Sequence, residues 1–395
     1  MIITCTSILA VDFKIFPRRF AKTESFGTSL MDVGVGSFVF AAGIVAARQQ
    51  LKERYAQSSS IVQRLRTAMR HSLPLLALGL IRLWSVKGLD YAEHASEYGV
   101  HWNFFFTLAL LSPAIAIIQP VLRLIPSPAY CLLAFIIGCC WETALWYVRD
   151  LKAWIILGER KEGDWLSQNR EGVFSMIGYL AIFIAGMGVG MDILPRSLEP
   201  ESDEPAVKDA LDEDDEWLAE VLGGDVGAAP AKPQVRPEQL GKPELPKTVL
   251  GRLVFWTGVW FVCCVWAMWH YGPELFVSRR MANLAYIVWV CAFNCGQLLL
   301  FCAVETVAFP NLYNAKDRAT ERQRIQDATS TVMQAFNRNG LALFLLANLL
   351  TGLVNMTIPT LHLGDVEAMA VLVGYIATLC GVAVALDRYD ISIKL

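Results

Sequence analysis

Charged side chains are scarce in this sequence. Asp, Glu, Lys and Arg make up 18% of its 395 residues, whereas about 25% is usual in a soluble globular domain. Hydrophobic residues reach 55%, and the mean hydropathy is +0.42. They gather in blocks of roughly 18–25 residues, the length that an α-helix needs to cross about 30 Å of hydrocarbon. This composition excludes an ordinary soluble domain and predicts a membrane protein.

Several familiar site motifs are also missing. The ten cysteines contain no CxxC pair of a zinc site, the five histidines form no HExxH pattern, and there is no GxxxxGK phosphate loop. The formal net charge of −3 provides no basic surface for nucleic acid. We therefore expect no metal site and no nucleic-acid partner, and we interpret the cysteines as small buried hydrophobic residues.

The apolar blocks predict an all-α, polytopic transmembrane bundle. Met1–Val11 lacks the basic stretch of a signal peptide and is interpreted as a partial first span. We therefore expect the chain to begin inside a longer protein. The nine full spans that follow are Leu30–Ala47, Leu73–Tyr91, Asn103–Ile125, Ala129–Val148, Val173–Leu194, Leu250–His270, Met281–Val307, Gly340–Leu361 and Val366–Leu386.

Basic residues in short loops predict which ends of the spans face the cytoplasm. The loop Arg48–His71 carries six Lys or Arg residues against one acid, and is therefore expected to be cytoplasmic together with Lys316–Arg324 and the C-terminal tail. Residues 12–29 and 149–172 carry basic side chains although they fall on the opposite face. The remaining segments of that face are residues 88–102, residues 271–280 and the turn at His362.

One long segment is not apolar. Residues 195–248 are rich in Pro, Ala, Asp and Glu and contain the acidic run Asp212–Glu216. Such a composition cannot bury enough apolar surface to order itself. We interpret the segment as a disordered cytoplasmic linker between membrane bundles at 1–194 and 249–395. A regulatory docking loop is the alternative.

Charged groups in or beside spans usually mark a site, and the first such cluster follows Met1–Val11. It contains Asp12, Arg18, Arg19 and Lys22 among aromatic residues. Because the positive-inside rule disfavours these charges on the predicted non-cytoplasmic face, we expect a function to require them. Anchoring of the long basic side chains at lipid headgroups is the alternative.

The second cluster runs from Arg82 to Asn103. Arg82 falls inside its apolar block and is expected to need a partner or a water-filled cavity, with Lys87 close by. Glu97 shares one helical face with two further acids, Asp90 and Glu93, for which a solvated helix extension is the alternative. His101 is either a base in acyl transfer or a hydrogen-bonded structural residue.

Two smaller polar groups complete the set. Asn169 and Arg170 lead directly into a span, where Asn169 is alternatively an N-cap. Asn348 and Asn355 lie seven residues apart and so on one helix face, where interhelical hydrogen bonding is the alternative. Loop counting places the first three clusters on the same face of the membrane, and this convergence favours a shared site.

Four runs of sequence carry a resemblance to a known family. They are Arg82–Leu108 (RLWSVKGLDYAEHASEYGVHWNFFFTL), Val11–Phe40, Asn169–Phe183 and Ala342–His362 with its NLLTGLVN. The chain is similar to the glucosaminyl-phosphatidylinositol inositol acyltransferases of GPI-anchor biosynthesis, and most similar to their fungal members. Unlike these, it lacks the spans that precede the Asp12–Lys22 loop.

The resemblance implies a multi-pass protein of the endoplasmic reticulum membrane, a membrane-bound O-acyltransferase. It would move a palmitoyl group from acyl-CoA, a co-substrate, to the inositol ring of glucosaminyl-phosphatidylinositol, with no bound cofactor. It also implies that Asp12 and Lys22 are catalytic. Asp12 would take the hydroxyl proton, and Lys22 would stabilise the oxyanion or orient Asp12. The substrate-binding candidates are Arg18, Arg19, Arg82, Lys87, Glu97, His101, Asn103, Asn169, Arg170, Asn348 and Asn355.

Two other classes of function compete with this interpretation. A transporter or flippase of a lipid-linked intermediate would also place charges inside the membrane, but it would add a pair of matching, Gly- or Pro-interrupted spans, which we do not find. A membrane scaffold would use the acidic linker as a docking segment. Deletion of residues 199–242 separates these classes, because an enzyme should tolerate the loss and a scaffold should not.

Overall fold

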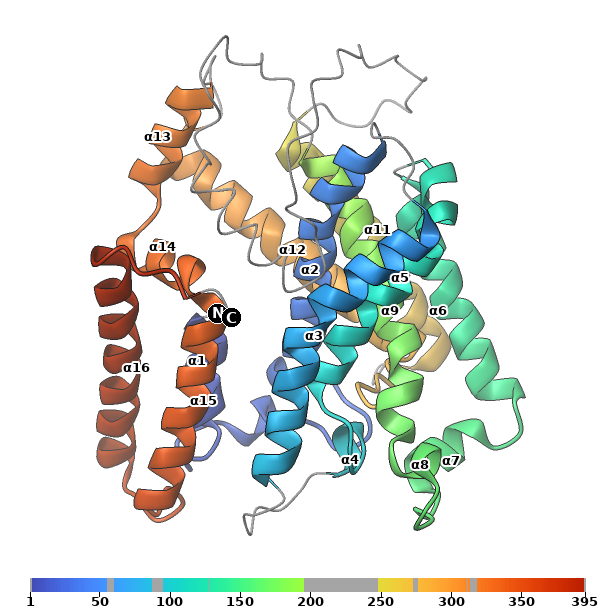
Figure 1. Cartoon of the computed structure of the whole chain (residues 1–395), viewed down its shortest axis with the longest axis horizontal. Helices are drawn as coiled ribbons and strands as arrows, with labels where there is room; N and C mark the ends of the chain where they lie inside the picture. The colour runs from blue at the N-terminus through green and yellow to red at the C-terminus, as the bar shows by residue number, and fades with distance from the viewer. Residues whose placement is uncertain are drawn as a thin grey trace.

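The computed structural model describes residues 2–54, 60–86, 95–126, 128–194, 248–272, 276–310, 312 and 318–393. Nearly all of the predicted linker lies outside these residues, as do Lys87, Asp90 and Glu93. The described parts are helical and contain no strand (Figure 1). The helices are α1 Ile2–Ala10, α2 Leu30–Arg54, α3 Ile61–Val86, α4 Ala95–Tyr98, α5 Phe104–Leu124, α6 Ala129–Tyr147, α7 Leu151–Leu157, α8 Trp165–Gln168, α9 Arg170–Ile193, α11 Val249–Tyr271, α12 Leu284–Ala308, α13 Arg318–Ala328, α14 Thr331–Arg338, α15 Gly340–Thr357 and α16 Asp365–Arg388, with a 3₁₀ turn at Arg18–Phe20.

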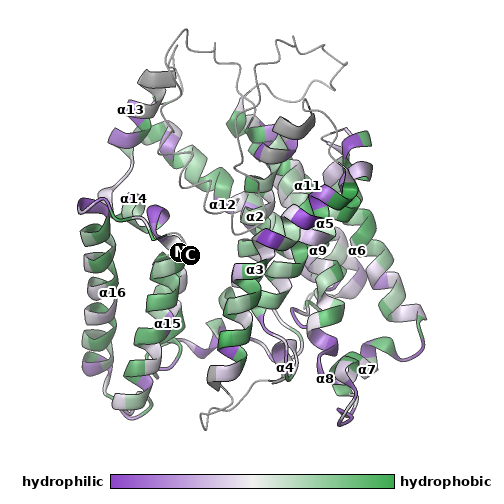
Figure 2. Ribbon diagram, viewed as in Figure 1, coloured by the Kyte–Doolittle hydropathy of each residue, from purple (hydrophilic) through white to green (hydrophobic). Residues whose placement is uncertain are grey.

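Eight helices among the described residues are long and apolar enough to cross a membrane: α2, α5, α6, α9, α11, α12, α15 and α16. They coincide with eight of the nine predicted full spans, and they confirm the all-α polytopic fold. The ninth prediction, Leu73–Tyr91, falls on α3. That helix begins earlier, at Ile61, and is not among the eight. It is described only as far as Val86, so residues 87–91 of the predicted span lie outside the described residues. Figure 2 shows apolar residues along the lengths of the helices and polar residues toward their ends.

Helix α9 lies at the centre of the larger group of helices, with 72% of its apolar window buried. Helix α2 packs against it at close range, because glycines face the partner backbone on both sides. A Cβ at Gly43 of α2 would lie 2.1 Å from the carbonyl oxygen of Phe183, and one at Gly186 of α9 would lie 2.2 Å from that of Phe40. Small residues are the usual means by which membrane helices approach so closely.

The buried apolar side chains form two main clusters whose membership does not follow chain order. The first joins α2, α3, α5, α6 and α9 to α11 and α12. The second joins α1, at the start of the chain, to α14, α15 and α16 near its end. In Figure 1 the second group lies on the left. Each cluster therefore contains residues from both sides of the predicted linker, and the division into bundles at 1–194 and 249–395 stays a prediction.

The segments that carry the polar clusters gather at one end of the molecule. Helices α4, α7 and α8, and the segment that follows α1, lie at the lower end in Figure 1, whereas α13 lies at the other. Ion pairs join these segments to one another and to residues 276–280. The predicted convergence of the first three clusters is thereby confirmed. The side of the membrane that this end faces stays a prediction.

Candidate functional site

Asp12 follows the last turn of α1, where the chain leaves the helix. Its Oδ2 accepts a hydrogen bond of 2.8 Å from Nδ2 of Asn355, near the end of α15. Burial raises the pKa of Asp12 above its ordinary value, although the bond from Asn355 and the charge of Arg18 both act to lower it. Asp12 is thus a carboxylate with increased proton affinity at the polar end of the molecule.

Lys22 lies in the same segment but has a different partner. Its Nζ is 2.9 Å from Oε1 of Glu97 on α4, and it is the more exposed member of the pair. Nη2 of Arg279, in the segment before α12, is 3.3 Å from the same oxygen of Glu97. The structure therefore brings Asp12 and Lys22 to one end of the protein, where Lys22 pairs with Glu97 and Asp12 with Asn355.

Arg279 is buried between two carboxylates. Its Nε lies 3.0 Å from Oδ1 of Asp32, in the first turn of α2. Burial acts to lower the pKa of Arg279, but the charge of Glu97 and other neighbours outweigh it, so the pKa is raised and the guanidinium stays charged. Burial also raises the pKa of the neighbouring Tyr98 to about 12, which keeps its hydroxyl protonated.

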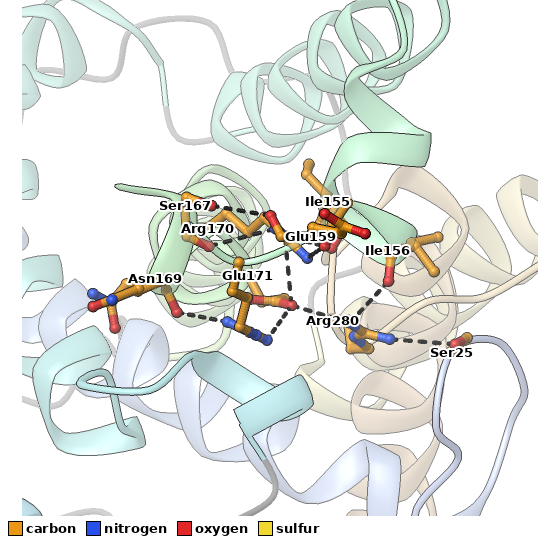
Figure 3. Close-up of polar contacts among 12 residues, drawn as sticks. Ser25, Ile155, Ile156, Glu159, Ser167, Asn169, Arg170, Glu171 and Arg280 are labelled. Carbon is orange, nitrogen blue, oxygen red and sulfur yellow. Dashed lines mark hydrogen bonds and ion pairs between the residues drawn. The ribbon is translucent and has the colours of Figure 1, made fainter. Parts of the chain in front are cut away.

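A second cluster surrounds Glu171, the first acid of α9, whose side chain is fully buried. Its Oε1 lies 2.8 Å from Nη2 of Arg160 and 3.0 Å from Nη2 of Arg280. Arg280 also donates to Oγ of Ser25 at 3.3 Å (Figure 3). This cluster ties the segment that follows Lys22 to α9 and to the segment that precedes α12.

Two residues predicted to bind substrate, Arg170 and Asn169, form hydrogen bonds with other groups of the protein. Arg170 donates to carbonyl oxygens at the end of α7, among them Ile155 at 3.1 Å (Figure 3). Oδ1 of Asn169 accepts from the backbone N–H of His101 at 2.8 Å. Asn169 occupies the N-cap position of α9, but its side chain makes no capping bond. It fixes the loop around His101 instead.

Asn103 has a structural role that its sequence position did not reveal. Its Oδ1 accepts from the backbone N–H of Phe106 at 3.3 Å and so caps α5, and its Nδ2 donates to the carbonyl oxygen of Gly79 at 2.9 Å. Asn103 thereby joins α5 to α3 and is buried. His101, two residues earlier, is partly buried and is held through its backbone.

Three of the four predicted phosphate-binding cations lie near the same end of the molecule. Nη1 of Arg18 donates to the carbonyl oxygen of Val11 at 3.0 Å, and the guanidinium of Arg19 lies 4.9 Å from the ring centroid of Phe20. Arg82 is exposed on α3, and its charge acts on the Tyr98 hydroxyl. Lys87, the fourth candidate, lies outside the described residues.

The two asparagines of α15 have different surroundings, although their spacing places them on one face. Asn355 contacts Asp12, whereas Nδ2 of Asn348 donates to the carbonyl oxygen of Phe344 in its own helix, at 2.7 Å. Only Asn355 makes an interhelical or site contact of the kind expected for the pair. Asn348 is exposed on the surface of its helix.

Sequence reasoning missed three charged residues at this end, Asp32, Arg160 and Arg280, together with the role of Arg279. A signal for them was present. Asp32 is a charge just inside a predicted span, and Arg160, Arg279 and Arg280 are basic residues on the predicted non-cytoplasmic face. Basic residues on the predicted non-cytoplasmic face pointed to the Asp12–Lys22 segment, and the same criterion applies to these loops.

Comparison with known proteins gives a consistent result over the whole chain. The model of a family described as GWT1 matches residues 1–386. A protein of Gibberella zeae is 50% identical over 403 residues, covering 100% of this chain and 72% of its own length. Proteins of Aspergillus oryzae and Candida albicans are 47% and 37% identical, with 100% of this chain and 72% and 74% of their own lengths covered. All three are named GPI-anchored wall transfer protein 1.

Proposed function

Because the chain belongs to the GWT1 family, we propose that it is an acyl-CoA-dependent inositol acyltransferase of the endoplasmic reticulum membrane. The family acts in the inositol acylation of GPI-anchor biosynthesis, and the chain is a multi-pass membrane protein. The proposed substrates are a fatty acyl-CoA, chiefly palmitoyl-CoA, and glucosaminyl-phosphatidylinositol. The proposal requires no bound cofactor.

The observation that carries the proposal is the environment of Asp12. A general base is most effective when its pKa lies closer to the working pH than that of a free carboxylate. Burial moves the pKa of Asp12 in this direction. Asn355 holds one carboxylate oxygen, so that the other is left to face a substrate hydroxyl.

The reaction follows from these groups. Asp12 removes the proton from an inositol hydroxyl as its oxygen attacks the thioester carbonyl carbon, forming a C–O bond and a tetrahedral oxyanion. The ammonium of Lys22 stabilises that oxyanion. Collapse of the intermediate breaks the C–S bond and releases the CoA thiolate, which takes up the proton held by Asp12. The products are the inositol ester and free CoA.

The surroundings suit two substrates of opposite character. Arg18, Arg19 and Arg82 offer guanidinium groups for the phosphates of CoA or of the phosphoinositide. A shallow hollow beside the same segment is lined by apolar side chains that include Ile15, Val366 and Met369. It offers an apolar surface for an acyl chain next to the segment that carries Asp12.

Replacement of Asp12 by Asn tests the proposal. Microsomes that contain the variant should lose inositol acylation by at least about 100-fold, the range expected when a general base is removed. Glu24→Gln is the matched control, because Glu24 is an exposed acid in the same segment. It should retain wild-type turnover. Wild-type turnover by Asp12→Asn would contradict the role of Asp12, and an inactive wild-type chain would contradict the proposed function.

A further inference from the structure

A line of four charged side chains leads inward from Lys22. Glu97 contacts Lys22, Arg279 contacts Glu97, and Asp32 contacts Arg279, at distances of 2.9, 3.3 and 3.0 Å. The exposed fraction of the side chain falls along this line, from 47% at Lys22 to 23%, 4% and 1%. Lys22 is therefore the member that a substrate can reach, and the other three lie behind it.

The same line also fixes the backbone next to Lys22. Asp32 accepts a hydrogen bond from the backbone N–H of Thr23 at 3.1 Å and another from its hydroxyl at 2.7 Å. The N–H of Gly27 donates to the carbonyl oxygen of Val277 at 2.9 Å, which ties this loop to the segment that carries Arg279. Asp32 therefore holds the main chain beside Lys22. Glu97, which is linked to Asp32 through Arg279, holds the ammonium of Lys22.

Arg279 is suited to connect the two carboxylates. Its planar guanidinium directs Nε toward Asp32 and Nη2 toward Glu97, so that one rigid group sets the distance between them. Lys22, in contrast, is a point charge on a flexible stem of four carbons, and it needs an external partner to hold it in one place. A displacement of about 1 Å at a reacting centre can cost about 100-fold in rate.

We propose that Glu97 and Arg279 are positioning residues that hold the Lys22 ammonium where the oxyanion of the thioester develops. This inference rests on the proposed function. Neither residue touches a reacting atom. Glu97 orients the ammonium, and Arg279 orients Glu97 from a buried site fixed by Asp32. The assignment gives Glu97 a role other than the substrate contact predicted from the sequence.

Glu97→Gln is the test variant, because it removes the negative charge and keeps the size of the side chain. Initial rates are measured in microsomes at varied palmitoyl-CoA and varied glucosaminyl-phosphatidylinositol. We expect kcat to fall by about 10- to 100-fold, with both KM values within about threefold of wild type. Asp387→Asn is the matched control. Asp387 has a similar exposure of 20% and a similar distance of 3.4 Å to an arginine, Arg338, in the other helix cluster.

Stability is measured alongside the rates, as a melting curve of the purified protein in detergent. A lower melting temperature with wild-type kcat per folded molecule would assign Glu97 a purely structural role and overturn the inference, as would a change confined to KM. Arg279→Lys serves as the second variant should Glu97→Gln fail to accumulate. Lysine cannot bridge both carboxylates, so kcat should again fall, and a wild-type kcat would overturn the inference.

Different results would contradict the proposed function and the positioning role. If the wild-type chain transfers no acyl group in these microsomes, the proposed function is wrong. If wild type is active and Asp12→Asn is not, while Glu97→Gln and Arg279→Lys both keep the wild-type kcat, only the positioning role is wrong. Asp387→Asn should behave as wild type in every case.

Discussion

Asp12 is subject to opposing influences from its neighbours. Burial favours its protonated form, whereas the amide of Asn355 and the charge of Arg18 favour the carboxylate. The balance leaves a pKa above the ordinary value. The pKa of the proposed base should therefore respond to the loss of any one of these neighbours, and Asn355 can be replaced without changing Asp12 itself.

Asn355→Leu should therefore move the acid limb of the pH–rate profile upward. The rate is lost as the pH falls through the pKa of Asp12, because only the carboxylate accepts a proton. Without the hydrogen bond that lowers it, this pKa rises further. A shift of about one pH unit corresponds to about 1.4 kcal/mol, in the range of a hydrogen bond to a charged group. The measurement is the initial rate as a function of pH, from acidic to slightly alkaline buffers.

Asn348→Leu is the control for this experiment. Asn348 lies on the same helix, but its side chain bonds to its own backbone at Phe344. The acid limb of the pH–rate profile of Asn348→Leu should coincide with that of wild type. An unchanged limb in Asn355→Leu would mean that Asp12 does not control the rate in this pH range.

Some of these residues could be predicted from the sequence and others could not. Asp12 and Lys22 stand out because their segment carries charges where the positive-inside rule disfavours them. The contact between Arg279 and Asp32 joins residues 247 positions apart, and that between Asn355 and Asp12 joins residues 343 positions apart. No local spacing encodes such pairs, because they depend on how the helices pack.

At the scale of elements, the close packing of α2 on α9 holds the polar end together. Asp32 lies in the first turn of α2 and Glu171 in the first turn of α9, and each anchors one charged cluster. The distance between the two clusters is thus set by the contact between these helices, which depends on Gly43 and Gly186.

Gly43→Ala should destabilise the protein by about 1–3 kcal/mol, the usual cost of overpacking. The new methyl group would meet the carbonyl oxygen of Phe183 and push the helices apart. Gly34→Ala, on the same helix, is the control. A Cβ there meets nothing within 4 Å, and alanine favours the helix. Thermal melting in detergent should show a lower midpoint for Gly43→Ala alone. Equal midpoints would refute this packing.

Eight of the spans follow from hydropathy, because length and apolar content are local properties of the chain. The exception, α3, shows the limit of that approach. Its predicted bounds began at Leu73, where the apolar residues begin, but the helix begins twelve residues earlier, at Ile61. Backbone hydrogen bonding continues through the polar residues, since arginine is a good helix former.

At the scale of the whole molecule, the polar clusters lie at one end, and the positive-inside rule assigns this end to the non-cytoplasmic side. The proposed co-substrate, acyl-CoA, would come from the cytosol. If Asp12 lies on the non-cytoplasmic side, the proposed reaction requires the spans to let CoA reach across the membrane. The side of the membrane on which Asp12 lies therefore decides how CoA reaches the site.

Cysteine accessibility measures that property directly. Glu24→Cys lies in the exposed part of the segment that carries Lys22, and Gln326→Cys lies on α13 at the other end. In sealed microsomes, a membrane-impermeant maleimide should label Gln326→Cys and leave Glu24→Cys unlabelled until detergent is added. Labelling of Glu24→Cys in sealed microsomes would reverse the predicted orientation and give CoA a direct route from the cytosol.

The pairing of α1 with α15 and α16 has a consequence for biosynthesis. A chain emerging from the ribosome exposes Asp12 long before Asn355 has been synthesised, because 343 residues separate them. The carboxylate that we propose as the general base therefore acquires its partner only when α15 has entered the membrane. Until then, α1 lacks the helices that it packs against in the folded protein. On the proposed mechanism, activity therefore arises late in translation, and a nascent chain arrested before α15 would be inactive.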